Sequence, residues 1–83
     1  MERADFLRKE DQVSVTILGP DNSRLYDKTT KGLHNINSAI QEALEDAHIE
    51  IDPEELVFVV DNITTGVSHR YRINAHGNIK LIV

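Results

Sequence analysis

The feature of this sequence that most constrains its fold is an uninterrupted apolar run over residues 56–60, Leu-Val-Phe-Val-Val. Asp52 and Pro53 stand shortly before the run, and Asp61 and Asn62 follow it directly. A short apolar run between turn-forming residues predicts a buried β-strand that is apolar on both faces. Because the chain has only 83 residues, few other elements are available to cover that strand.

Alternation and turn signals predict four further strands. Residues 13–17 alternate strictly between apolar and polar side chains, and the turn formers at 19–23 lead to a second strand at about 24–29. After the apolar run, strands are predicted at 67–73 and 79–83, each preceded by a short connection rich in Asn and Gly. Connections this short predict antiparallel neighbours.

One helix is predicted at about 35–48. Its apolar stripe has helical spacing and consists of Ile36, Ile40, Ala43, Leu44 and Ala47. Asn35, Asn37 and Ser38 are alternative N-caps. The order β-β-α-β-β-β predicts an α+β fold, a single mixed or antiparallel sheet with one helix packed across one face.

The chain is predicted to be one domain over residues 12–83, preceded by a mobile tail over residues 1–11, which show no clean periodicity. It contains no cysteine, which excludes disulfides and thiolate zinc sites. The first ten residues are too polar for a signal peptide, and no apolar run approaches the length of a membrane span. We therefore expect a cytoplasmic protein that does not attach to a membrane.

The succession of hairpin, helix, acidic turn and strong strand over about residues 12–60 resembles that of ubiquitin-like β-grasp domains. The passage Ile-Asp-Pro-Glu-Glu-Leu-Val-Phe at 51–58 is loosely similar to the corresponding passage in those domains. The resemblance implies a β-grasp topology as one of several, with a crossover before the last strand. The connection at 74–78 is short for such a crossover. The sequence ends Leu81-Ile82-Val83 without a Gly-Gly pair, so we expect no conjugation.

The acidic residues are concentrated in one segment. Residues 34–61 contain eight acids and no Lys or Arg, whereas residues 62–83 contain three bases and no acid. Glu42, Glu45 and Asp46 on the polar side of the predicted helix form an acidic patch. One interpretation is the solvent face of an amphipathic helix. Another is an acidic decoy that inhibits an enzyme by occupying its nucleic-acid-binding groove.

The cations of the C-terminal third form a second candidate surface. Alternation predicts that Arg70 and Arg72 point outward while His69 and Tyr71 face the core, and Lys80 on the next strand joins the two arginines. Either this is a solvated sheet face, or the cations and Tyr71 bind a phosphate, the backbone of a nucleic acid or an acidic peptide. Three cations are few for strong binding to a polyanion, because affinity scales with the number of phosphates neutralised.

Catalytic and metal-binding chemistry has little support in the sequence. The four histidines, His34, His48, His69 and His76, form neither the helical pair nor the close cluster that transition metals favour. No serine or threonine lies in a nucleophile motif. We expect a protein that is not an enzyme and requires no cofactor.

The surplus of apolar residues gives the leading functional hypothesis. Leu56, Phe58 and Val60 share one face of their strand and Val57 and Val59 share the other, but one helix covers only one face. On the last strand, Ile82 extends the second stripe, which would need cover from the N-terminal segment, from a second copy or from another protein. We therefore predict a small non-catalytic protein–protein interaction module, an adapter or a regulatory protein. It would bind a partner of unknown identity, or a second copy of itself, through the sheet face or edge.

Overall fold

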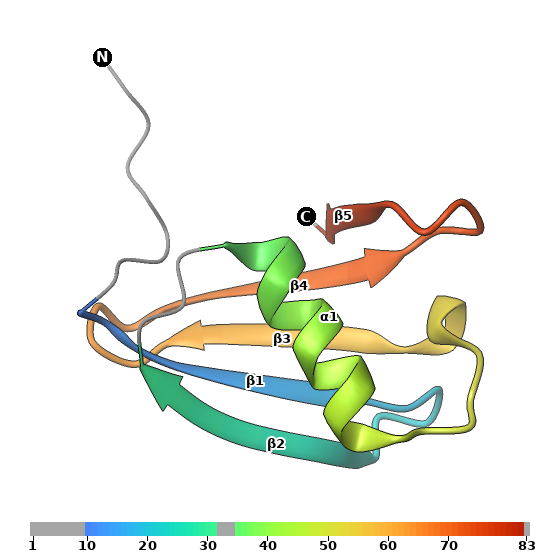
Figure 1. Ribbon diagram of the computed structural model, residues 1–83, viewed down its shortest axis with the longest axis horizontal. Coiled ribbons are helices and arrows are strands. Elements are labelled where there is room, and N and C mark those ends of the chain that lie inside the picture. The colour runs from blue at the N-terminus through green and yellow to red at the C-terminus, as the bar shows by residue number, and fades with distance from the viewer. Residues whose placement is uncertain (1–9, 32–34, 83) are drawn as a thin grey trace.

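The computed structural model describes residues 10–31 and 35–82, which form one sheet and one α-helix (Figure 1). The elements in chain order are β1 (Gln12–Leu18), β2 (Arg24–Lys31), α1 (Ile36–Ala47), a 3-10 turn η1 (Pro53–Glu55), β3 (Val57–Asn62), β4 (Val67–Ile73) and β5 (Ile79–Ile82). This succession confirms the α+β fold class and the predicted element order.

The strands of the described residues lie in the order β2-β1-β3-β4-β5, and each neighbouring pair is antiparallel. The sheet is therefore antiparallel and not mixed. A β-grasp topology is wrong for this chain, because residues 74–78 form a hairpin connection from β4 to its direct neighbour β5. No crossover precedes the last strand, and a connection this short allows only an antiparallel neighbour.

The helix packs across one face of the sheet, which we name the helix face; the opposite face is the open face. Figure 1 shows α1 running obliquely over the strands. Leu56, Phe58 and Val60, the first face of the apolar run, are completely buried. Each such side chain stabilises the fold by about 1.5–3 kcal/mol through its burial. The buried apolar core consists of Val13, Val15, Ile17, Ala39, Ile40, Ala43, Leu56, Phe58, Val60, Tyr71 and Ile73.

Local hydrogen bonds fix where the helical elements begin. Of the three candidate caps of α1, Asn35 is the one used: its Oδ1 accepts a hydrogen bond from the backbone N–H of Ser38 at 3.2 Å. The helix ends at Ala47, and its C-cap His48 adopts a left-handed conformation with φ of 52°. The turn predicted at 52–55 is η1, where Asp52 Oδ1 accepts from the N–H of Glu54 at 3.2 Å.

Residues before β1 join the fold through a buried polar contact. Asn62 Nδ2 donates to Asp11 Oδ2 at 2.7 Å, and the two residues are only 1% and 3% exposed. The backbone N–H of Gln12 also donates to Thr64 Oγ1 at 2.9 Å. These bonds fix the start of β1 against the β3–β4 turn. Residues 1–9 of the predicted tail lie outside the described residues.

Candidate functional site

The open face carries the second apolar stripe where the sequence predicts it. Val57 and Val59 are half-buried on β3, and Leu18 of β1 lies directly opposite Val57. Ile82 on β5 is 38% exposed and lies opposite Arg70 of β4. The stripe is therefore interrupted, because Arg70 stands between Val59 and Ile82 in one row across the sheet. The helix of the described residues packs on the other face and leaves this stripe uncovered.

The three predicted cations share the open face at the β4–β5 side of the sheet. Arg72 and Lys80 are direct cross-strand neighbours, and Arg70 lies one alternation further along β4. All three are exposed, and none forms a salt bridge within the described residues. Arg72 Nη1 donates a long hydrogen bond of 3.5 Å to the carbonyl oxygen of Glu54. Like charges directly opposite one another are unfavourable, so this arrangement favours an anionic neighbour.

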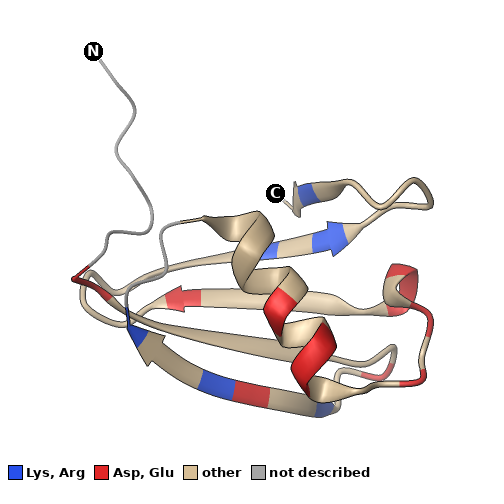
Figure 2. Ribbon diagram, in the orientation of Figure 1, with Lys and Arg blue, Asp and Glu red and all other residues tan. Residues whose placement is uncertain are grey.

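Figure 2 shows the segregation of charge in three dimensions. Lys and Arg mark β4 and β5, whereas Asp and Glu mark the C-terminal half of α1, the segment after it and η1. The edge strand β2 differs from β5 because it carries both signs. Arg24 pairs with Asp27 at 3.6 Å and Lys28 pairs with Asp46 of the helix at 3.3 Å. The cations of β4 and β5 therefore have no acid on their own strands, whereas two of the three cations of β2 are paired with Asp27 and Asp46.

The two sheet edges also differ in apolar exposure. Leu81 and Ile82, adjacent on β5, are 51% and 38% exposed. Leu81 lies opposite Tyr71 and so belongs to the helix face, whereas Ile82 belongs to the open face. The hypothesis drawn from the sequence emphasised Ile82 and missed Leu81. Alternation along β5 predicts that Leu81 and Ile82 lie on opposite faces, but only the position of β5 at the edge of the sheet leaves Leu81 exposed.

The predicted acidic patch of Glu42, Glu45 and Asp46 lies on the exposed side of α1, but Asp46 is already engaged. Its Oδ2 accepts hydrogen bonds from Tyr26 Oη at 2.9 Å and from Lys28 Nζ at 3.3 Å. The Tyr26 hydrogen bond, followed by Lys28, lowers the pKa of Asp46. Desolvation and the Asp46 hydrogen bond raise the pKa of Tyr26 to about 12. Asp46 therefore connects α1 to β2. Glu42 and Glu45 are the acids of the patch that are available to a binding partner.

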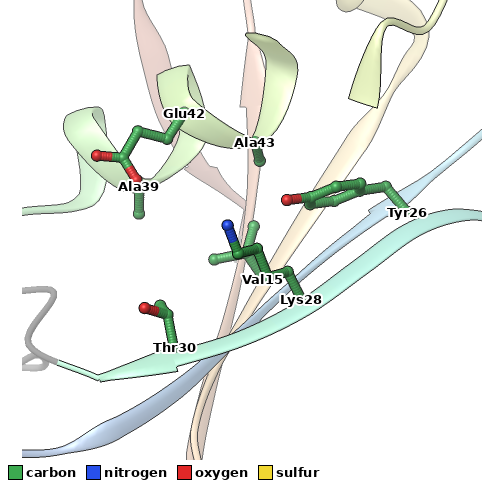
Figure 3. A pocket seen from close by; sticks show the side chains of 7 residues that line it. All are labelled: Val15, Tyr26, Lys28, Thr30, Ala39, Glu42 and Ala43. Carbon is green, nitrogen blue, oxygen red and sulfur yellow. The ribbon is translucent and has the colours of Figure 1, made fainter. Parts of the chain in front are cut away.

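A small hollow lies between α1 and β2, beside this contact (Figure 3). Its volume of about 30 Å³ leaves room for only one or two water molecules. Tyr26 and Lys28 point into it from β2, below Glu42 of the helix. It is too small for a cofactor or an organic substrate. The lining residues are Val15, Tyr26, Lys28, Thr30, Ala39, Glu42 and Ala43.

Tyr71 does not join the cations, which corrects its predicted role in nucleic-acid binding. The ring lies on the helix face and is only 8% exposed, with Oη 3.2 Å from Nδ1 of His69. Desolvation by burial raises the pKa of Tyr71. The side chain therefore cannot stack on a base beside Arg70 and Arg72, which point to the opposite face.

No set of three His, Asp or Glu side chains in residues 10–31 and 35–82 lies close enough together to hold a metal ion. His34 lies outside the described residues. Within the same ranges, no helix combines the length and apolar character needed to cross a membrane.

Comparison with models of known protein families, with curated proteins and with solved structures gave no match to this chain.

Proposed function

We propose that this protein is a small non-catalytic interaction module that binds another protein at the β4–β5 side of its sheet. The observation that carries the proposal is the edge strand β5, where the adjacent Leu81 and Ile82 are 51% and 38% exposed. An edge strand presents unpaired backbone donors and acceptors to which a partner strand can bind. Exposed apolar side chains on both of its faces add area to such an interface.

The open face supports the same proposal. Val57 and Val59 lie on a face that the helix leaves uncovered, and Arg70, Arg72 and Lys80 rim them toward β5. Interfaces commonly combine an apolar centre with a polar rim, and arginine is enriched in them. A partner strand at β5 would lie beside this rim, so the edge and the face form one continuous surface.

The proposal is tested by capture of a partner with matched variants. We would immobilise the chain, recover bound proteins from native lysate, and compare the wild type with Ile82→Ser and Leu25→Ser. Leu25 on β2 is 39% exposed and Ile82 is 38% exposed, so the two variants remove similar apolar surface from opposite edges.

We expect a partner that Ile82→Ser loses and that Leu25→Ser retains. Sedimentation of the purified chain at micromolar concentration tests self-association alongside. A strictly monomeric chain that recovers no partner overturns the proposal. Equal capture by the wild type and both variants also overturns it, because binding would then not involve β5.

A further inference from the structure

The outer edge of β5 combines unpaired backbone with side chains of a single charge sign. Among the described strands, β5 pairs only with β4, so its outward N–H and C=O groups have no strand partner. Leu81 on the helix face and Lys80 and Ile82 on the open face flank that edge. A strand added here would complete the hydrogen bonding of the backbone and cover the exposed Leu81 on the helix face.

The charges around this edge specify what such a strand should carry. Arg72 lies opposite Lys80, and neither β4 nor β5 contains an acidic residue. Asp61, the acid of neighbouring β3, lies opposite Ser68 and not opposite a cation. Carboxylates placed beside the cations would relieve their mutual repulsion and form charge-assisted hydrogen bonds with the guanidinium groups.

We propose that β5 accepts an extended segment of a partner protein in which acidic and apolar side chains alternate. This inference rests on the proposed function and deepens it by naming the chemistry of the partner. Successive side chains of a strand point to opposite faces. In the register that places its acidic side chains on the open face, these lie next to Lys80 and Ile82, with Arg70 and Arg72 one strand further in, and its apolar side chains lie on the helix face next to Leu81.

A second copy of this chain fits the edge less well. Antiparallel pairing of two β5 strands about a two-fold axis perpendicular to the sheet keeps both open faces on the same side. Arg70, Arg72 and Lys80 of each copy would then flank the seam without any acid from β4 or β5 to separate them. Like-charge neighbours across strands are destabilising, so charge complementarity favours an acidic partner over self-pairing.

Nucleic acid also fits less well than an acidic protein segment. Three cations neutralise few phosphates, and the buried Tyr71 ring lies on the other face of the sheet. A phosphate backbone would leave Leu81 and the outward N–H and C=O groups of β5 uncovered. An extended peptide satisfies the charges, the exposed leucine and the backbone together.

The test uses fluorescein-labelled peptides and fluorescence anisotropy with the full chain. The probe is an eight-residue peptide that alternates glutamate with valine. The comparison peptides replace glutamate by lysine, or group the same residues into a glutamate block and a valine block. We expect binding of the alternating glutamate peptide, weakening as salt is raised, and at least tenfold weaker binding of both comparison peptides.

A pair of charge-reversal variants locates the site. Arg70→Glu/Lys80→Glu should weaken binding of the alternating glutamate peptide at least tenfold. Arg24→Glu/Lys31→Glu makes the same change in net charge at exposed residues of β2 and should leave binding unchanged. Circular dichroism tests whether both variants fold. If Arg70→Glu/Lys80→Glu does not fold, Arg70→Gln/Lys80→Gln takes its place.

The opposite outcomes are distinguishable. Equal or tighter binding of the lysine peptide, or a stable dimer at micromolar concentration, overturns the inference that the partner segment is acidic. Either result remains compatible with protein binding at β5. Tighter binding of a labelled single-stranded oligonucleotide than of any peptide overturns the acidic segment in favour of nucleic acid. Failure of all peptides, together with no partner captured through Ile82, overturns both this inference and the proposed function.

Discussion

Val59 and Val60 provide the sharpest test of which face of the sheet is the core. They are consecutive residues of β3 with the same side chain, but they point to opposite faces. Val60 is fully buried under α1, opposite Val15, whereas Val59 is half-buried on the open face, opposite Thr16. Substitution of each by alanine removes the same two methyl groups, so any difference between the variants reports the environment.

The expected loss for Val60→Ala follows from its complete burial. Two methyl groups contribute about 1.6 kcal/mol by transfer, and the cavity left in a packed core raises the loss to about 2–3 kcal/mol. Val59→Ala should cost less than about 1 kcal/mol, since its side chain already contacts solvent. Loss of the β-branched side chain affects both variants similarly and cancels in the comparison.

Urea unfolding followed by circular dichroism measures both losses. We expect equal m-values, and a melting temperature lower by roughly 10 °C or more in Val60→Ala. A domain of this size has a total stability of only about 4–12 kcal/mol, so the loss is easily measured. Equal losses in the two variants, or a larger loss in Val59→Ala, would show that the open face is covered as well as the helix face, which would contradict the assignment of the core to the helix face.

Three further predictions concern polar groups. The pKa of Tyr26 rises from 10.0 to about 12 on folding. Its contribution to the free energy of unfolding is therefore complete below pH 10 and is lost between pH 10 and 12. Between pH 10 and 12 the urea midpoint should therefore fall more steeply with pH in the wild type than in Tyr26→Phe. The same pH dependence in both proteins would contradict the raised pKa of Tyr26. Asn62→Ala leaves the buried Asp11 carboxylate without its amide donor at 2.7 Å and should cost about 3 kcal/mol in urea unfolding. A loss under about 1 kcal/mol would show that the contact is replaceable. Asn35→Ala removes the helix cap and should lower the unfolding free energy by about 1 kcal/mol. The neighbouring control Asn37→Ala should stay within about 0.5 kcal/mol, and equal losses would contradict the cap assignment.

The elements were predictable because their signals are local. Strict alternation predicted the strand at 13–17, short connections rich in Asn and Gly predicted the strand at 67–73, and the spacing of apolar residues predicted α1. The start of β3 was less predictable. Leu56 belongs to the apolar run but precedes the strand, because its backbone N–H donates to the carbonyl of Pro53 at 3.1 Å and ends η1. The hydropathy pattern of the sequence gives no signal of such a hydrogen bond.

The candidate surface was predictable in part, for the same reason. Alternation correctly placed Arg70 and Arg72 away from the core, and the short connection at 74–78 made Lys80 a neighbour. The role of Asp46 was not predictable. Its partners Tyr26 and Lys28 lie on a strand far from the helix in sequence, and only the packing of α1 over β2 brings them together.

Sequence pattern alone predicted the five strands and one helix found in residues 10–31 and 35–82, and an apolar run with two faces of which a single helix covers one. Strands and helices can be predicted because their signals are the spacings of apolar residues two to four positions apart, which are read directly from the sequence. Only the tertiary structure decided which strands lie at the edges and which cations share a face. Strand order arises from contacts between distant residues, and it is this order that leaves the cationic, apolar edge of β5 unpaired among the described strands.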